Sequence, residues 1–525
     1  MADSSRTHRK RVAVIGAGAS GIVTARYLLK HGADVVVFEK HSGVGGQWDC
    51  HSPYSGVWHS MRTNTCSVTT QFSDLRHASD VCLFPRNQKI LAYLKRYATT
   101  FGVLEHVRFN TRVMLLEPLA SGWQVISLVE ENHVQHEEFD AVVIASGRFT
   151  KPYIPSVHGL ESFSGDAGVV HSYRYMHPER FKGQRVVVGG GSISAYEIST
   201  SLVMAGAREV VTAGRRVKYL VGRLFRGVPT EYLKHSRYEG MLAEVHGKKY
   251  TQQRLQHFIE HSMGRPEQFS SLQPEVPFPH AGISTSETFL PLVAEGHITP
   301  KPWISRVAGK NVYYSDGTVT RDVDCLLMCT GYDLEIPFLS QDVIDHIQLT
   351  RKHIPLAWQT FHPAYPTLAF LGFWFHSGSV FVSTEQQARF VAYVFSGVQK
   401  PPAQGAMERE LQRYMRQKAS YGKVSLTTYS QTLSKVGGFA VDLYAYPELA
   451  RYLLFGPMTS SSFRLNGIDA LSDAPQRIME DAARFGILED GVLTAQERRQ
   501  LRELAALKND APFTRYVKQI LRAAR

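Results

Sequence analysis

Short apolar runs separated by helical segments dominate the start of the chain and predict a parallel α/β sheet. Residues 11–15 form an apolar run, a helix is expected over 22–31, and a second apolar strand over 34–38 ends at Glu39. Three glycines lie between the first strand and the helix in the spacing GxGxxG: Gly16, Gly18 and Gly21. Glycines so placed allow a tight turn, close approach of the backbone to a pyrophosphate, and close packing of helix on strand. This segment therefore predicts a mononucleotide-binding fold.

The acidic residue that ends the second strand indicates which nucleotide this first fold binds. Glu39 follows Gly21 by 18 residues, where a carboxylate can accept hydrogen bonds from an adenosine ribose. The same carboxylate repels a 2′-phosphate, while the free N–H groups at the helix start attract the pyrophosphate. We therefore predict FAD at this site.

The pattern of apolar strand, glycine turn, helix and strand returns after residue 184. A helix is expected over 196–205 and a strand over 209–212. The turn between the preceding strand and this helix is irregular, and two registers fit it: Gly189, Gly191 and Ser194, or Gly190, Ser192 and Ala195. In either register small residues replace one or two of the glycines, so the turn still predicts a second nucleotide site.

Two arginines at the end of the second fold contrast with the carboxylate of the first. Arg215 and Arg216 follow the strand 209–212, and a guanidinium supplies the fixed charge and fork geometry that a 2′-phosphate needs. The second site is therefore expected to bind NADPH. Hydride transfer from NADPH to FAD is the simplest reason for one chain to hold both sites.

Two similar strands bracket the second fold and predict how the domains are connected. Residues 140–147 and 324–331 share an Asp, four mostly apolar residues, a small residue, Ser or Thr, and Gly. The second strand ends at Thr330 and Gly331, which are expected near a cofactor. We predict an α/β protein with two Rossmann-like dinucleotide-binding domains in a glutathione-reductase-like arrangement. The expected parts are a discontinuous FAD domain (1–165 and 325–470), an inserted NADPH domain (166–324) with a helical insertion at about 219–302, and a helical C-terminal extension (471–525).

Composition limits the alternatives. The 525 residues suffice for two or three domains, and a formal charge of +12 without a long basic run or zinc-finger pattern argues against nucleic acid. No signal-peptide h-region or membrane span is expected, so a cytoplasmic protein is predicted. The five cysteines form no CxxC pair, which argues against a disulfide reductase. A non-catalytic FAD-binding protein would have little use for Arg215 and Arg216.

Further segments, in this order, resemble the class B flavin monooxygenases and especially the flavin-containing monooxygenase (FMO) family. Residues 45–48 match its GGxW segment, 61–65 its Thr-Asn segment and 72–74 its Phe-Ser-Asp segment. The second half of its FxGxxxHxxxY motif matches 171–175, and 329–332 stand where the family has Ala-Thr-Gly-Tyr. Three C-terminal stretches continue the match: 366–372, 385–389 and 455–465. The resemblance extends over most of the chain. It departs from the family where five residues, not three, separate Gly165 from His171, and where Met176 replaces the usual Lys.

The resemblance implies that FAD, reduced by NADPH, adds oxygen as a C4a-(hydro)peroxyflavin and oxygenates the nitrogen or sulfur of a small organic substrate. Asn64 is implied to donate a hydrogen bond beside the flavin, although the residues alone favour an Asn that caps a turn. The other residues implied near the flavin are Gly46, Gln47, Trp48 and Thr63. His171 and Tyr175 are expected to orient the linker between the domains. Tyr175, where Baeyer–Villiger enzymes have Trp, favours N- or S-oxygenation.

Two alternative reactions stay open at this point. One is Baeyer–Villiger oxygenation of a ketone, and the other is an NADPH oxidase reaction that releases hydrogen peroxide. The insertion is expected to shape substrate access. The C-terminal helices, whose capping-box start is expected at Thr494 and Glu497, either cover the site or form a contact in a homo-oligomer.

Overall fold

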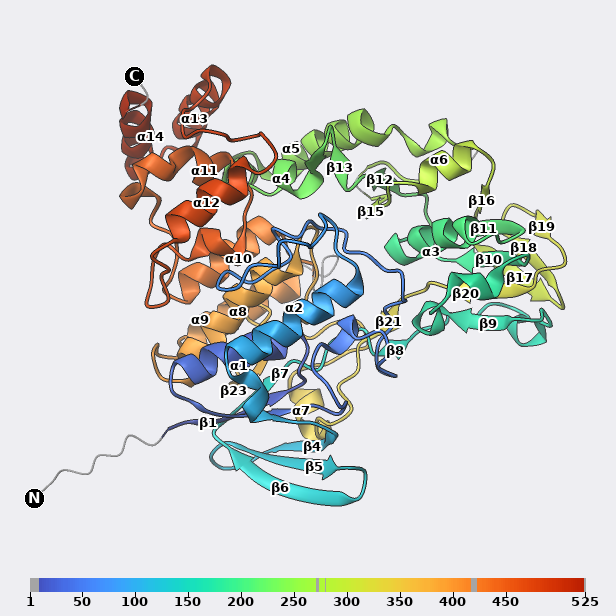
Figure 1. Ribbon diagram of the computed structural model, residues 1–525, viewed down its shortest axis with the longest axis horizontal. Helices are drawn as coiled ribbons and strands as arrows, with labels where there is room; N and C mark the ends of the chain where they lie inside the picture. The colour runs from blue at the N-terminus through green and yellow to red at the C-terminus, as the bar shows by residue number, and fades with distance from the viewer. Residues whose placement is uncertain (1–8, 271–272, 279, 417–422, 524–525) are drawn as a thin grey trace, which may run out of the picture.

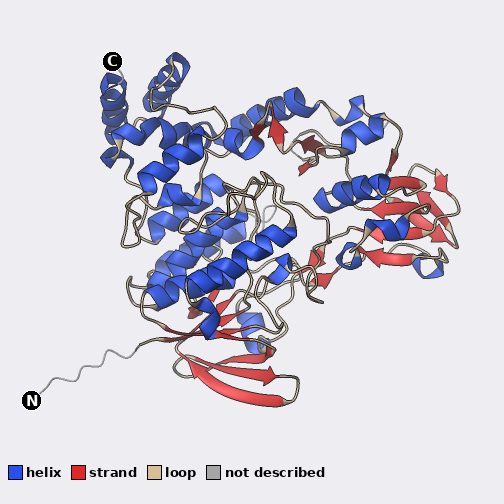
Figure 2. Ribbon diagram, viewed as in Figure 1, coloured by secondary structure: helices blue, strands red, loops and turns tan. Residues whose placement is uncertain are grey.

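The computed structural model describes residues 9–270, 273–278, 280–416 and 423–523 (Figure 1). Two separate sheets, the first mainly and the second wholly parallel, organise the chain; helices cover one face of the first sheet, and a mostly helical segment extends from the second (Figure 2). Within the described residues no helix is both long and apolar enough to cross a membrane.

The first sheet has the strand order β22–β23–β7–β1–β2–β3. Its strands are β1 (Arg11–Ile15), β2 (Asp34–Phe38), β3 (Val107–Arg108), β7 (Ala141–Ile144), β22 (Phe361–His362) and β23 (Tyr365–Phe370). One face packs against α1 (Ala19–Lys30), α2 (Asn87–Thr100) and α8 (Val380–Phe395). The other face packs against an antiparallel sheet of β4 (Thr111–Pro118), β5 (Trp123–Val129) and β6 (His133–Phe139).

The predicted strands 11–15 and 34–38 are confirmed, and they pair in parallel with Ile15 opposite Phe38. The helix begins at Ala19 rather than at Ile22. The prediction placed its start after the last glycine, but Gly21 lies inside the helix, where the lack of a side chain lets the helix approach the preceding turn.

The second sheet is entirely parallel, with the order β16–β11–β10–β20–β9. Its strands are β9 (Gly168–His171), β10 (Arg185–Gly189), β11 (Glu209–Ala213), β16 (Ile298–Lys301) and β20 (Cys325–Met328). α3 (Ile193–Met204) covers one face, and a small sheet of β17 (Ile304–Ala308), β18 (Asn311–Tyr314) and β19 (Val319–Thr320) covers the other. The helix again begins three residues before the predicted 196.

Two of the expected domain limits shift in the structure. The prediction returned the chain to the FAD domain at residue 325, but residues 325–328 are β20 and pair with β10 in the second sheet. The chain leaves this sheet only after Met328, at the antiparallel pair of β8 (Lys151–Pro152) and β21 (Tyr332–Asp333). The expected insertion also extended to residue 302, whereas residues 298–301 are β16, an edge strand of the same sheet.

The remaining insertion is mostly helical and reaches from the second sheet to the C-terminal helices, along the top of Figure 1. It contains α4 (Thr230–Lys234), α5 (Arg237–Met263), α6 (Phe289–Ala294), and the short strands β12 (Tyr219–Val221), β13 (Leu224–Phe225), β14 (Val228–Pro229) and β15 (Ile283–Thr285). The other helices are α7 (Gln341–His346), α9 (Gln404–Arg416), α10 (Leu426–Val436), α11 (Ala450–Phe455), α12 (Ala474–Ala483), α13 (Ala495–Lys508) and α14 (Ala511–Ala523).

The C-terminal extension is helical, as expected, and α13 begins with the predicted capping box. The Thr494 hydroxyl accepts from the backbone N–H of Glu497, while the Glu497 carboxylate accepts from the backbone N–H of Thr494. Apolar residues of α13 and α14 share one core with Tyr238 and Leu242 of α5. The extension therefore packs against the insertion.

Candidate active site

The first glycine turn has the geometry of a dinucleotide cradle. Gly16 has φ +105°, and a Cβ added there would lie 2.7 Å from the carbonyl oxygen of Ala145. A Cβ on Gly21 would lie only 1.8 Å from the carbonyl oxygen of Gly16. Both positions therefore require glycine, one for its backbone conformation and one because helix and turn are in direct contact.

The start of α1 fits the pyrophosphate of FAD. The N-cap residue of α1, Gly18, has no side chain to cap the helix, and the first turn holds no acidic residue, so the N–H groups of this turn can bind an anion. Gly46 approaches this point closely, since a Cβ on Gly46 would lie 3.0 Å from Cα of Gly18. Glu39 is buried at the end of β2, and its carboxylate accepts from the backbone N–H groups of Ala17 at 2.7 Å and His41 at 2.9 Å. A carboxylate fixed in this way fits the ribose.

The next two residues after Gly46 are Gln47 and Trp48, both predicted to lie near the flavin. Gln47 lies in η1 (Gly46–Trp48); its amide nitrogen donates to the carbonyl of Phe149 at 3.0 Å and its oxygen accepts from the N–H of Gly56 at 3.2 Å. Trp48 packs partly buried against the core of the first domain. Gln47 therefore connects the segment that follows β7 to the loop that follows η1.

The structure selects one register for the second glycine turn. The N–H of Gly190 donates to Ala213 at 2.8 Å, as that of Gly16 donates to Phe38 at 2.8 Å. Gly190 has φ +156°, and a Cβ there would lie 2.5 Å from the carbonyl oxygen of Cys329. The equivalent triad is thus Gly190, Ser192 and Ala195. Gly189 is the last residue of β10, Gly191 lines the cavity described next, and Ser194 lies in the first turn of α3.

A small cavity, partly open to solvent, lies beside this turn. Three cations line it: Arg216, Lys218 and Lys301. Its described lining holds no carboxylate, and its apolar walls include Tyr196 and Phe289. Burial, with further contributions from the charges of Lys423 and Arg216, lowers the pKa of Lys218. Such a concentration of positive charge favours an anion, and the cavity thus fits the phosphorylated adenosine end of NADPH.

The two predicted arginines have different surroundings. Arg216 lines the cavity, whereas the guanidinium of Arg215 lies 4.8 Å from the ring centre of Trp303. Sequence reasoning missed Lys218 and Lys301. Lys218 is only two residues beyond Arg216 and could have been considered, but Lys301 reaches the cavity only because β16 pairs with β11.

Thr330 and Gly331 lie where the chain leaves the second sheet. The Thr330 hydroxyl donates to the carbonyl of Tyr153, and the Gly331 carbonyl accepts from the N–H of Tyr153 at 3.0 Å. Nε2 of His171 donates to the same Gly331 carbonyl at 3.0 Å, while its Nδ1 accepts from the N–H of Tyr173 at 3.0 Å. Burial lowers the pKa of His171. His171, at the end of β9, therefore contacts both the segment that follows it, at Tyr173, and the segment at Gly331 where the chain leaves the second sheet.

Asn64 contacts the insertion. Its carbonyl oxygen accepts from Nε of Arg223 at 3.2 Å, and Nη2 of Arg223 is 2.8 Å from the carboxylate of Glu197 on α3. Burial raises the pKa of Glu197, although Arg223 opposes the shift. The neighbouring Thr63 is buried, and its hydroxyl donates to the carbonyl of Thr65 at 2.8 Å. With its oxygen engaged by Arg223, Asn64 can offer its amide nitrogen as a donor.

Three of the matched segments meet away from this region, in one buried polar network. Glu385 accepts from the hydroxyl of Tyr27 at 2.6 Å, from the N–H of Ser73 at 2.9 Å, and from Nη1 of Arg464 at 3.2 Å. The side chains of Glu385 and Arg464 are fully buried. A buried, hydrogen-bonded ion pair holds distant segments in register, since removing either partner leaves an uncompensated charge. The role of these three segments is thus structural, because their side chains hold the fold together.

Two dinucleotide-binding folds, one ending in a carboxylate and the other beside a cationic cavity, define a flavoprotein oxidoreductase that takes two nucleotide cofactors. Comparison with known proteins identifies its family. The profile of the FMO-like family, described as flavin-binding monooxygenase-like, matches residues 9–503. The chain belongs to this family and is a flavin-dependent monooxygenase, an enzyme class that uses FAD and NADPH together with molecular oxygen and a small-molecule substrate.

Its relatives in sequence agree with this assignment, and its structural neighbours share its fold. It is 28% identical to dimethylaniline monooxygenase [N-oxide-forming] 2 of Cavia porcellus and 28% identical to flavin-containing monooxygenase 5 of Rattus norvegicus, over 91% of this chain and 92% of each relative. Its fold is similar to S-allyl-L-cysteine S-oxygenase from Allium sativum (TM-score 0.62, 23% identity, 84% of this chain and 92% of that one). It is also similar to cyclohexanone monooxygenase in an open form (TM-score 0.62, 17% identity, 82% and 98%).

Proposed function

We propose that this enzyme uses NADPH in preference to NADH and transfers one oxygen atom of O₂ to a nucleophilic nitrogen or sulfur of a small organic substrate. The observation that carries the proposal is the difference in charge between the two nucleotide sites. Glu39 ends the second strand of the first fold, whereas Gly214 holds the equivalent place in the second, where Arg216, Lys218 and Lys301 surround a cavity.

The cationic cavity accounts for the choice of nicotinamide nucleotide. A 2′-phosphate carries two negative charges near neutral pH and gains from three nearby cations, while the bare ribose of NADH gains little. The absence of a side chain at Gly214 leaves room for the phosphate where a carboxylate would repel it. Tyr196 and Phe289 supply an apolar wall suited to the adenine.

Asn64 is the residue that we assign to the oxygen-transfer step. The flavin, when bound, supplies the redox chemistry that activates oxygen. Asn64 donates a hydrogen bond from its amide nitrogen without providing an acidic proton, and Arg223 holds the amide so that its carbonyl oxygen points to the insertion. Glu197 fixes the guanidinium in turn. Arg223 is thus a positioning residue, and the insertion acts on the reaction through it.

The preference for nitrogen or sulfur rests on two supports. Tyr175 stands where Baeyer–Villiger enzymes have Trp, and it is buried against Trp58 and Phe181. The relatives found by sequence similarity include enzymes named for N-oxide formation, whereas cyclohexanone monooxygenase is similar to this chain in fold. Ketone oxygenation and peroxide release are the competing outcomes.

The test supplies the purified enzyme with NADPH, O₂ and one of three substrates: a tertiary amine, a thioether or a cyclic ketone. Oxygen consumption, peroxide and product are measured in the same reaction. We expect N-oxide or sulfoxide in near-stoichiometric yield with NADPH consumed. Ester or lactone from the ketone as the main product would favour Baeyer–Villiger chemistry, and stoichiometric peroxide with every substrate would identify an oxidase.

A further inference from the structure

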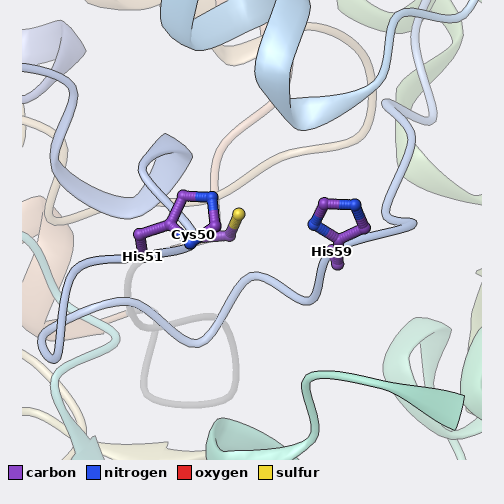
Figure 3. Close-up of side chains that lie close together, drawn as sticks. All are labelled: Cys50, His51 and His59. Atoms are coloured by element: carbon purple, nitrogen blue, oxygen red, sulfur yellow. The ribbon is translucent and has the colours of Figure 1, made fainter.

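A thiol and two imidazoles gather in the loop that follows η1. Cys50, His51 and His59 each bring one ligand atom to within 4.8 Å of the others (Figure 3). The side chain of Cys50 is buried, while those of His51 and His59 are exposed. The proposed oxygenation uses none of these groups, so their proximity needs its own explanation.

The donor set suits zinc. A thiolate and neutral imidazoles are the ligands that Zn²⁺ takes in tetrahedral sites, with bonds of about 2.0–2.3 Å that place the donors about 3.3–3.8 Å apart. The three donor atoms lie within 4.8 Å of one another, so at the outer limit they are about 1 Å farther apart than this. Because both histidines are exposed, rotation of their side chains can close the difference without movement of the backbone.

The position of the loop gives such a site a structural consequence. The hydroxyl of Tyr173 donates to the carbonyl of Pro53 at 3.2 Å, and the N–H of His59 donates to the carbonyl of Met176 at 3.2 Å. The loop 50–59 therefore lies along the segment that leads from β9 toward β10. On that segment the ring of His177 lies 5.7 Å from the ring of His59, centre to centre.

We propose that Cys50, His51 and His59 bind one Zn²⁺ ion, with His177 as the fourth donor. The Cys50 thiol releases its proton to solvent on binding, and no oxidation or reduction takes place. The bound ion ties the loop 50–59 to the segment that enters the second sheet. Its test does not require turnover.

The experiment measures zinc binding by the full-length flavoprotein under reducing conditions, by competition with a chromogenic zinc chelator. Wild type is expected to bind one equivalent. Cys50→Ser and His59→Ala each weaken binding by about 100-fold, and His177→Ala by about tenfold. Flavin content, measured on every variant, checks that folding is intact.

Two control variants separate this site from other zinc-binding groups. Cys82→Ser removes an exposed cysteine, and His261→Ala removes one of two neighbouring histidines on α5, His257 and His261; neither is expected to change the affinity. A direct measurement needs no variant: zinc should protect Cys50, but not Cys82, from alkylation. The proposal is overturned if wild type binds no stoichiometric zinc, if Cys50→Ser retains full affinity, or if Cys50 alkylates equally fast with zinc. If His177→Ala binds zinc with unchanged affinity, His177 is not a ligand, and the proposal that the ion ties the two segments together is overturned.

Discussion

Arg216 and Arg215 are adjacent in sequence, yet the structure predicts that only one of them recognises NADPH. Arg216 lines the cationic cavity, and Arg215 lies on the ring of Trp303. We expect Arg216→Ala to weaken NADPH binding and leave NADH binding unchanged, because only NADPH carries the 2′-phosphate. Arg215→Ala is the matched control, since it removes the same charge one residue away.

The size of the effect follows from the surroundings of Arg216. A hydrogen bond to a charged group contributes about 1.5–3 kcal/mol. Arg216 is exposed, and Lys218 and Lys301 remain beside the phosphate after the substitution. We therefore expect the lower end, about 1.5 kcal/mol, which corresponds to about a tenfold rise in the dissociation constant. Arg215→Ala is expected to change the dissociation constant by less than about twofold, because its exposed guanidinium lies on Trp303 and does not line the cavity.

Anaerobic reduction of the flavin, followed by stopped-flow absorbance at several NADPH and NADH concentrations, separates the dissociation constant from the hydride-transfer rate. The reciprocal variant Gly214→Glu places a carboxylate at the position equivalent to Glu39, where an added Cβ would lie 3.5 Å from its nearest neighbour, the carbonyl oxygen of Arg216. It should shift preference toward NADH. The reasoning is refuted if Arg215→Ala has the larger effect, or if Arg216→Ala weakens both nucleotides equally.

Three other predictions concern the flavin site, oxygen transfer and stability. Gly21→Ala forces a methyl group against the Gly16 carbonyl and should yield protein without flavin, measured by absorbance; full flavin content would contradict the cradle. Asn64→Ala should keep flavin reduction but release more peroxide, and Arg223→Ala should act in the same direction more weakly, whereas the exposed Arg226→Ala should not; normal coupling in both Asn64→Ala and Arg223→Ala would exclude this pair. Burial raises the pKa of Asp481 from 3.8 to about 6, so ionisation of this carboxyl costs the folded state up to about 3 kcal/mol above pH 6. Asp481→Asn should therefore raise the melting temperature at pH 8, with a gain that fades as the pH falls from 6 to 4; a gain independent of pH would show that the carboxyl is not responsible.

Sequence reasoning succeeded where one local pattern decides the structure. The strands 11–15 and 34–38 are correct because each apolar run is bounded by a clear turn, and the capping box at Thr494 is correct because its interactions span only four residues. It left the second turn ambiguous because Gly189, Gly190 and Gly191 are chemically identical. Only the pairing of Gly189 with Ala213 in the sheet settles which glycine begins the turn.

The cationic cavity shows why the rest could not be predicted. Arg216 was visible at a strand end, but Lys301 belongs to β16, which sequence reasoning had assigned to a helical insertion. Parallel pairing of β16 with β11 places Lys301 opposite Ala213. The third charge is therefore a property of sheet order, which no local pattern encodes.

The contact between Asn64 and Arg223 is a second feature that no local sequence pattern encodes, and it also has a functional consequence. The two residues are 159 positions apart, and from the residues alone Asn64 fitted a turn cap better than a donor near the flavin. An Asn that only capped its own turn would not need a guanidinium, itself paired with Glu197, on its carbonyl oxygen. Arg223 belongs to the insertion and Glu197 to the nucleotide-binding helix α3. We therefore expect a shift of that domain to move the amide of Asn64, so that binding of NADPH and the orientation of the proposed donor are connected through one arginine.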